Sequence, residues 1–269
     1  MDARRRRTRR MRALIVAALL CSQLPLAVAQ TTEGPALLAA FKAWQTTAAP
    51  GAEWAAALDQ YRAKLVRDGR TPAAADRALR LITAYDEAEL YDAVYAKTPE
   101  FNTQPNQLLV EAARSLRAGR ALDVGIGMGR NALHLARAGW DVTGFDVSSV
   151  GVRHAEAAAR TEKLRLKAVV AADEEFDFGT AQWDLIALIY TIEKRSIHHV
   201  RRALRPGGVV VVEAGITPDA KAAFGYAPGE LLTIFDGFEI VRHEQLEGSY
   251  DWGPERIQLV RLVARKPLR

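Results

Sequence analysis

The sequence predicts an α/β protein built on a doubly wound sheet of seven strands, most of them parallel, with additional helices on the N-terminal side. From about residue 105, short β-branched runs alternate with amphipathic segments of helical spacing, which is the pattern of strands joined by crossover helices. The runs "WDLIALIY" and "VVVVEA" are apolar without alternation and indicate strands covered on both faces. We predict strands at 120–125, 141–146, 165–171, 183–190, 208–214, 237–245 and 256–265.

The last two predicted strands differ from the others in how they are connected. Only "LEGSYDWGPE" lies between them, which is too short for a crossover helix. An antiparallel pair needs only a short connection. We therefore expect the final strand to run antiparallel to its neighbours.

Residues 30–100 are predicted to form a helical region of their own. The segment 36–97 is rich in alanine, and its tryptophan, tyrosine and leucine side chains recur at helical spacing. Thr71 suits the N-cap and Pro72 the first position of a helix that continues to about Ala96. We expect two or three helices whose aromatic residues pack together. Their residues do not decide whether they cap a binding site, form a dimer or only pack.

The first 29 residues concentrate the positive charge of the chain. The formal net charge of the 269 residues is +5, and this block holds seven arginines and one aspartate, so the remaining residues carry −1. A nucleic-acid-binding surface needs cationic side chains spread over the folded protein. We therefore do not expect nucleic acid as a partner.

The same block has the three parts of a secretory signal peptide. The basic segment Arg4–Arg12 precedes the apolar run Ala13–Val28, and Ala27-Val28-Ala29 forms a small-residue cleavage site. The apolar run is short for a membrane span, and a glutamine and a proline interrupt it. We expect residues 1–29 to be removed and the protein to be exported, periplasmic or secreted, without a stable membrane span. The alternative is a misassigned start and a cytoplasmic protein. Cys21, the only cysteine, would leave with this segment.

The turn after the first predicted strand is suited to an electron-rich ligand. Gly125, Gly127 and Gly129 follow the strand, and a helix is expected from near Arg130 to Gly139. Glycine lets the backbone bend sharply and approach a ligand, while the first N–H groups of a helix point outward toward it. The turn does not match the dinucleotide fingerprint G-x-G-x-x-G, because Arg130 stands where its third glycine belongs.

The stretch Asp123–Gly129 instead resembles motif I, D/E-x-G-x-G-x-G, of the class I S-adenosylmethionine-dependent methyltransferases. Asp146 in "VTGFDVS" and Asp173 in "VVAADEEF" match the acidic residues that end the second and third strands in this family. "WDLIALIY" and "ALRPGGVVVVEA" resemble its fourth strand and its helix, Pro-Gly-Gly turn and fifth strand. "FNTQPNQLL" and "GMGRNALHLARAGWDVTGFD" are similar to the tellurite-resistance and thiopurine-type branch of small-molecule methyltransferases.

The resemblance implies a Rossmann-like sheet of strand order 3-2-1-4-5-7-6 in a domain covering residues 101–269, with S-adenosylmethionine as cofactor. It implies that the glycine turn lies by the methionine end, that Asp146 accepts hydrogen bonds from the ribose hydroxyls and that Asp173 lies near the adenine. The segment Phe101–Asn106 is implied to fold over the methionine end. The cofactor-binding residues that follow are Asp123, Gly125, Gly127, Gly129, Arg130, Asn131, Asp146, Val147, Asp173, Glu174 and Tyr190.

Several of these residues keep a second interpretation. Asp123 has an equal alternative as a cap of the turn, and Asp173 has one in a solvated acidic run that includes Glu174. Tyr190 follows the fourth strand at the carboxyl edge, where an acceptor is expected, but it could also be a packing aromatic. Asp146 has the weakest alternative, because a carboxylate that closes a buried strand needs a partner.

Together these features predict a methyltransferase that acts on a small molecule. Methyl transfer is an in-line displacement from a cofactor already activated by its sulfonium charge, so positioning supplies much of the rate. No catalytic triad can be read from residue order, and the adjacent His198-His199 lacks the spacing of a metal pair, so neither a catalytic residue nor a metal is assigned. The alternatives are a non-catalytic protein that binds the cofactor and, less favoured, an NAD-dependent oxidoreductase. The acceptor, the methylated atom and the oligomeric state are left open.

Overall fold

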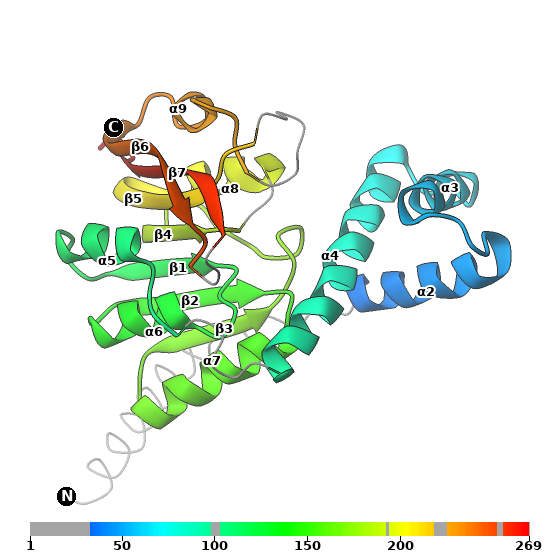
Figure 1. Cartoon of the computed structure of the whole chain (residues 1–269), viewed down its shortest axis with the longest axis horizontal. Helices are drawn as coiled ribbons and strands as arrows, with labels where there is room; N and C mark the ends of the chain where they lie inside the picture. Colours follow the sequence, from blue (N-terminus) through cyan, green and yellow to red (C-terminus); the bar gives the residue numbers. More distant parts are fainter. Residues whose placement is uncertain (1–32, 98–102, 192–193, 218–224, 252–254, 269) are drawn as a thin grey trace, which may run out of the picture.

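The structure, a computed structural model, describes residues 33–97, 103–191, 194–217, 225–251 and 255–268. These residues form a seven-stranded sheet with helices on both faces and, beside it, a region of three helices (Figure 1). None of the helices within these ranges has the length and apolarity needed to cross a bilayer. The predicted signal peptide, residues 1–29, and the predicted boundary at residue 100 lie outside the described residues.

The N-terminal region consists of α2 (Glu33–Ala48), α3 (Trp54–Arg67) and α4 (Pro72–Lys97). The predicted start of α4 is confirmed, since Thr71 Oγ1 accepts a hydrogen bond from the backbone N–H of Ala74 at 3.2 Å. The fully buried Phe41 lies edge-on to the rings of Trp54 and Tyr61, at centroid distances of 5.0 and 5.2 Å. The aromatic residues of this region therefore form its core, as the helical spacing predicts.

The sheet has the predicted strand order. Its order is β3-β2-β1-β4-β5-β7-β6, and β7 runs antiparallel to both β5 and β6. All other pairings are parallel. The strands are β1 (Arg120–Val124), β2 (Asp141–Asp146), β3 (Leu166–Val170), β4 (Trp183–Ile189), β5 (Leu204–Gly215), β6 (Glu239–Ser249) and β7 (Arg256–Arg265).

The fifth strand begins earlier than predicted. Trp183 of β4 pairs with Leu204, but Leu185 pairs with Val209, so the register shifts across the Pro-Gly-Gly segment. Gly207 has a φ of +77°, which a glycine adopts without steric cost. The segment predicted to be a turn before the strand is thus an irregularity inside it, because β5 resumes its pairing on the far side.

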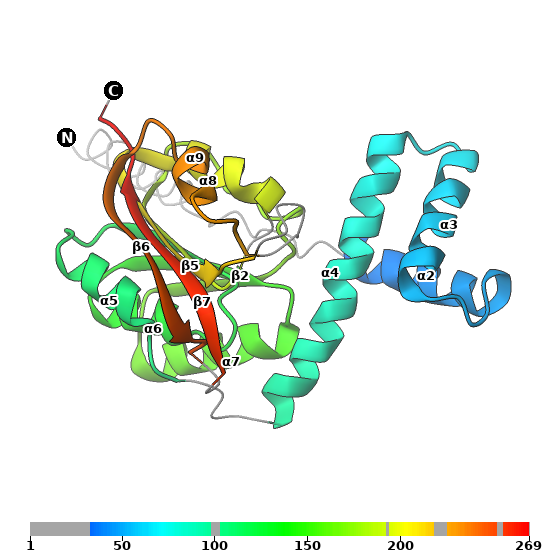
Figure 2. The same cartoon turned by 45° about the horizontal axis from the view of Figure 1, so that its top comes forward.

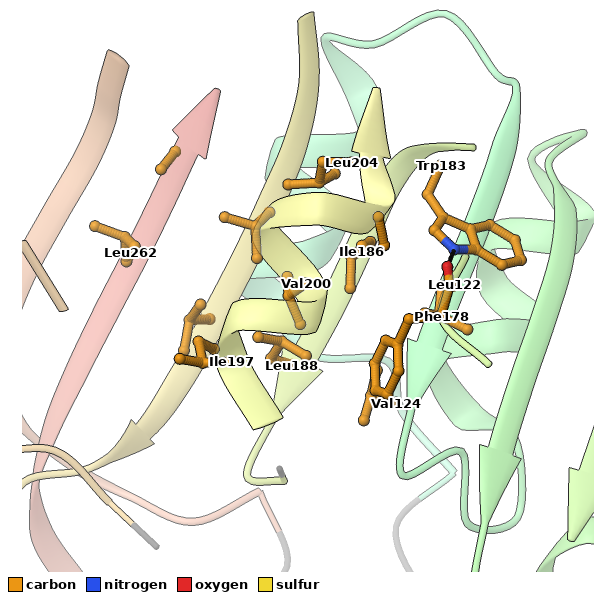
Figure 3. Packing of buried hydrophobic residues seen from close by; sticks show 14 of the residues in the cluster. Leu122, Val124, Phe178, Trp183, Ile186, Leu188, Ile197, Val200, Leu204 and Leu262 are labelled. Atoms are coloured by element: carbon orange, nitrogen blue, oxygen red, sulfur yellow. Dashed lines mark hydrogen bonds between the residues drawn. The ribbon is translucent and has the colours of Figure 1, made fainter. Parts of the chain in front are cut away.

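The two faces of the sheet carry separate apolar layers, because alternate side chains of each strand point in opposite directions. Figure 3 shows Val200 of α8 (Ile197–Ala203) packed near Leu188 of β4. In the same layer, Trp183 donates its indole N–H to the carbonyl oxygen of Phe178 at 2.8 Å. One layer lies under α5 (Gln107–Arg114), α6 (Arg130–Arg137) and α7 (Ser149–Glu162), and the other under α8 (Ile197–Ala203) and α9 (Glu230–Ile234).

The stability of the sheet is expected to depend on this packing. Leu188 is fully buried, so Leu188→Ala should lower the free energy of unfolding by about 2–5 kcal/mol through lost transfer energy and the cavity left behind. Leu90→Ala, at a position 63% exposed on α4, is the control and should change it by less than about 0.5 kcal/mol. Urea unfolding measures both. Equal effects of the two substitutions would contradict the assigned core.

Candidate functional site

The glycine turn has the conformation that its sequence predicts. Gly125, Gly127 and Gly129 have φ values of +68°, +50° and +90°, and α6 begins directly after them. A Cβ on Gly129 would lie 2.8 Å from the Cβ of Ala155, and one on Gly125 would collide with Thr191. No larger residue fits there without rearrangement, so the backbone of the turn stays bare at the carboxyl edge of β1.

Asp146 at the end of β2 holds this turn in place. Its Oδ2 accepts a hydrogen bond from the N–H of Gly127 at 2.9 Å, and its Oδ1 accepts one from the N–H of Ser148 at 2.8 Å. Burial raises the pKa of Asp146, and these two backbone hydrogen bonds act in the opposite direction. Each carboxylate oxygen has a further lone pair, so a diol such as that of ribose can still be bound.

Asp123 lies in β1 beside the turn and is almost completely buried. No donor among the described residues reaches its Oδ2. Burial raises its pKa to about 7, although the charge of Arg130 and the N–H of Ala132 lower it. A buried carboxyl oxygen without a donor is suited to a ligand that brings one, and the ammonium group of a bound methionine moiety has that chemistry. The residues present therefore fit S-adenosylmethionine.

The first residues of α6 bind the segment that precedes α5. The Nη1 of Arg130 contacts Asp251 Oδ2 at 2.7 Å and donates to the carbonyl oxygen of Gln104 at 3.0 Å. Asn131 Oδ1 accepts the backbone N–H of Asn106 at 2.9 Å. The part of the predicted covering segment that the structure describes, residues 103–106, is thus held at the turn; residues 101–102 lie outside the described residues.

Glu213, which was not predicted from the sequence, organises a second polar cluster at this edge. Glu213 lies in β5 with no exposed surface, and its carboxylate accepts hydrogen bonds from Asn106 Nδ2 at 2.7 Å, from the hydroxyl of Tyr190 and from the guanidinium of Arg261. A glutamate that ends a run of valines was a visible signal, because a charge in a buried strand requires partners.

Tyr190 follows β4 in a left-handed backbone conformation. Its φ is +57°, which is costly for a bulky side chain, and its N–H donates to the carbonyl oxygen of Glu213 at 2.8 Å. Burial and the bond to Glu213 raise the pKa of its hydroxyl, which stays protonated. The ring meets Tyr250 edge-on at 5.3 Å. Tyr190 therefore belongs to a polar cluster at the carboxyl edge and is more than a packing aromatic.

The predicted adenine end lies against the N-terminal helices. Glu174 forms an ion pair with Arg80 of α4, with Nε and Oε1 at 2.5 Å, and Val147 packs on the apolar core of the helical region. The predicted alternative of a solvated acidic run does not hold for Glu174. Asp173 follows β3 near the buried Tyr226, whose pKa is raised by burial and by the charges of Glu230 and Asp173.

Of the adjacent histidines, His198 is exposed and His199 is half-buried. The rings of His198 and His199 are 3.9 Å apart, and His199 stacks on Phe178 at 5.5 Å. Among the described residues, no group of three or more His, Cys, Asp or Glu side chains is arranged to hold a metal ion.

Comparison with known proteins agrees with this geometry over part of the chain. Residues 121–208 match the family described as a methyltransferase domain. The same residues carry the glycine turn and Asp146, within a sheet of order 3-2-1-4-5-7-6. This part of the chain therefore resembles the class I S-adenosylmethionine-dependent methyltransferases. S-adenosylmethionine is the cofactor of this family.

Two curated relatives are similar to this chain. Hemagglutinin 1 of Eikenella corrodens is 28% identical over 181 residues, which cover 61% of this chain and 60% of that protein. The probable S-adenosyl-L-methionine-dependent methyltransferase TehB of Haemophilus influenzae is 24% identical over 174 residues, which cover 59% of this chain and 61% of TehB. The match to TehB confirms the resemblance to the tellurite-resistance branch. The chain thus spans only about three fifths of the length of these relatives.

Solved structures show the same fold at lower sequence identity. The crystal structure of TehB from Haemophilus influenzae has a TM-score of 0.53 at 20% identity, over 59% of this chain and 61% of that chain. The 1,6-didemethyltoxoflavin-N1-methyltransferase of Burkholderia thailandensis, solved with S-adenosylhomocysteine, has a TM-score of 0.51 at 16% identity, over 68% of this chain and 90% of that chain. These similarities support the Rossmann-like architecture.

The raised pKa of Asp123 predicts a pH-dependent stability. Its folded pKa of about 7 exceeds the usual 3.8, so the folded protein binds a proton more tightly than the unfolded chain, and this stabilisation fades as the pH rises through 7. Asp123→Asn removes this titration. The unsubstituted protein should lose this stabilisation with rising pH, and the variant should not. The difference in free energy of unfolding, variant minus unsubstituted protein, should therefore increase by on the order of 2–4 kcal/mol between pH 4 and pH 8. Urea unfolding at a series of pH values measures it, and a constant difference would contradict the assignment.

Proposed function

We propose that this protein transfers the methyl group of S-adenosylmethionine to a small-molecule acceptor. The observation that carries the proposal is the bare glycine turn held between Asp146 and the buried Asp123. This arrangement offers backbone N–H groups, an acceptor for a diol and an acceptor for an amine within one edge of the sheet. The match to the methyltransferase domain family supports it.

The residues of the chain bind and orient the two reactants. In the proposed complex the glycine turn and Asp123 hold the methionine moiety, Asp146 and Val147 lie at the ribose, and Asp173 lies near the adenine. When bound, the cofactor supplies a methyl group on a positively charged sulfur. The remaining task is to align the acceptor atom for in-line attack, which is positioning.

The acceptor is expected at the cluster around Tyr190 and Tyr250, because the carboxyl edge between β4 and β5 adjoins the methionine end of the turn. The carboxylate of Glu213 is buried and already binds three donors, and the Tyr190 hydroxyl is held protonated. Neither group is a free general base. The cluster therefore favours an acceptor whose nucleophilic atom already carries an available lone pair at neutral pH.

Cofactor binding provides the decisive experiment. Calorimetric titration of the full chain with S-adenosylhomocysteine should give micromolar or tighter binding, and Asp146→Ala should weaken it by about a hundredfold, because two charge-assisted hydrogen bonds of about 1.5 kcal/mol each are lost. Asp141→Ala is the matched control, since Asp141 lies exposed at the opposite end of the same strand.

The outcomes separate the proposed function from its alternatives. If the folded protein fails to bind, or if Asp146→Ala binds as tightly as the unsubstituted chain, the cofactor site is wrongly assigned. Binding of NADH in its place would favour an oxidoreductase. A non-catalytic binding protein would bind S-adenosylmethionine tightly but form no S-adenosylhomocysteine with any thiol, amine, hydroxyl or metalloid acceptor.

We also propose that residues 1–29 are a signal peptide and that the mature protein is exported. The basic segment, the apolar run and the Ala27-Val28-Ala29 site support this. Mass spectrometry of the exported fraction should find a chain that begins at Gln30. An unprocessed chain found only in the cytosol would contradict export. Because S-adenosylmethionine is made in the cytosol, export also requires a supply of cofactor outside it.

A further inference from the structure

Helix α4 extends from the N-terminal region to the cofactor edge of the sheet. In Figures 1 and 2 its C-terminal end lies beside the start of α7. Asp92 makes this contact: its Oδ1 accepts hydrogen bonds from Ser148 Oγ at 2.5 Å and from the N–H of Val150 at 3.0 Å, and its Oδ2 accepts one from Ser149 Oγ at 3.2 Å. An acidic group suits this position, since the first N–H groups of a helix lack partners within the helix.

One turn further along α4, Tyr95 lies directly over the glycine turn. A Cβ on Gly127 would lie 2.9 Å from the Tyr95 hydroxyl, and one on Gly151 would lie 3.0 Å from Cε2 of the ring. Tyr95 is only 8% exposed. Its ring and hydroxyl therefore lie against the glycine turn and the first turn of α7.

Several polar contacts join the helical region to the sheet domain. Arg80 pairs with Glu174, the hydroxyl of Tyr85 donates to Glu175 Oε2 at 2.7 Å, and Asp92 binds the start of α7. Ala172 is the one buried side chain from the described sheet domain in the apolar cluster of the helical region. Contacts of this kind separate at lower cost than a continuous apolar core.

We propose that the C-terminal end of α4 forms a cover of the cofactor site: Tyr95 contacts the bound adenosyl amino acid, and Asp92 is a positioning residue that docks α4 on α7. This inference rests on the proposed function, because the ligand under the cover is the cofactor of that function. Entry and release of the cofactor then require α4 to move away from Gly127 and Asp146.

The test compares S-adenosylhomocysteine binding by three variants of the full chain. Tyr95→Ala and Asp92→Ala should each weaken binding by about tenfold and speed dissociation, because each removes contacts at or beside the ligand. Leu90→Ala is the matched control on the same helix, 63% exposed, and should leave binding unchanged. Hydrogen exchange of the unsubstituted chain should slow at residues 85–96 when S-adenosylhomocysteine is added, and this readout does not depend on how a variant folds.

The outcomes distinguish this inference from the proposed function. If the unsubstituted chain binds S-adenosylhomocysteine but Tyr95→Ala binds equally well and exchange in α4 does not change, the cover is refuted while the cofactor site stands. If the folded unsubstituted chain does not bind S-adenosylhomocysteine, both the proposed function and the cover are wrong. Weaker binding by both variants, with the control unchanged and α4 protected by the ligand, supports the cover.

Discussion

The carboxylate of Asp146 joins the parts of the molecule on which the cofactor site depends. Its hydrogen bonds to the N–H groups of Gly127 and Ser148, at 2.9 and 2.8 Å, hold the glycine turn against β2 and fix the chain where α7 begins. Asp92 of α4 binds at that same helix start. The sheet, the turn and α4 therefore meet at the start of α7, where the backbone N–H groups that Asp146 orients stabilise its charge.

A second buried carboxylate, Glu213, plays the corresponding part on the acceptor side. It binds Asn106, which caps α5, Arg261 of β7 and Tyr190 after β4. Removing any one donor would leave a buried charge incompletely paired, which costs more than the bond itself contributes. The cluster thus fixes three separate elements around the place where the acceptor is expected, and it holds Tyr190 in a backbone conformation that a tyrosine rarely adopts.

The strand order and Asp146 could be predicted from the sequence, because both depend on residues that are close together along the chain. Apolar runs, the short last connection and the family resemblance give the strand order, and Asp146 follows from its place at the end of a strand. The roles of Glu213 and Tyr95 could not be predicted, because they depend on residues that are distant in the sequence. Asn106 is separated from Glu213 by 107 positions. Tyr95 contacts the glycine turn only because α4 packs on the sheet domain. Glu174 pairs with Arg80, which is 94 positions away in the sequence. The acidic residues next to Glu174 therefore suggested a solvated acidic run as an alternative.

Three carboxylates converge on the glycine turn, and their charges act on one another. The pKa of Asp146 is raised first by burial and also by Asp92, and that of Asp123 first by burial and also by Asp146. If S-adenosylmethionine binds as proposed, its sulfonium and ammonium groups bring positive charge to this acidic site, whereas the demethylated product keeps only the ammonium. The negative charge at this site therefore suits a ligand that brings positive charge, as the ammonium proposed beside Asp123 does.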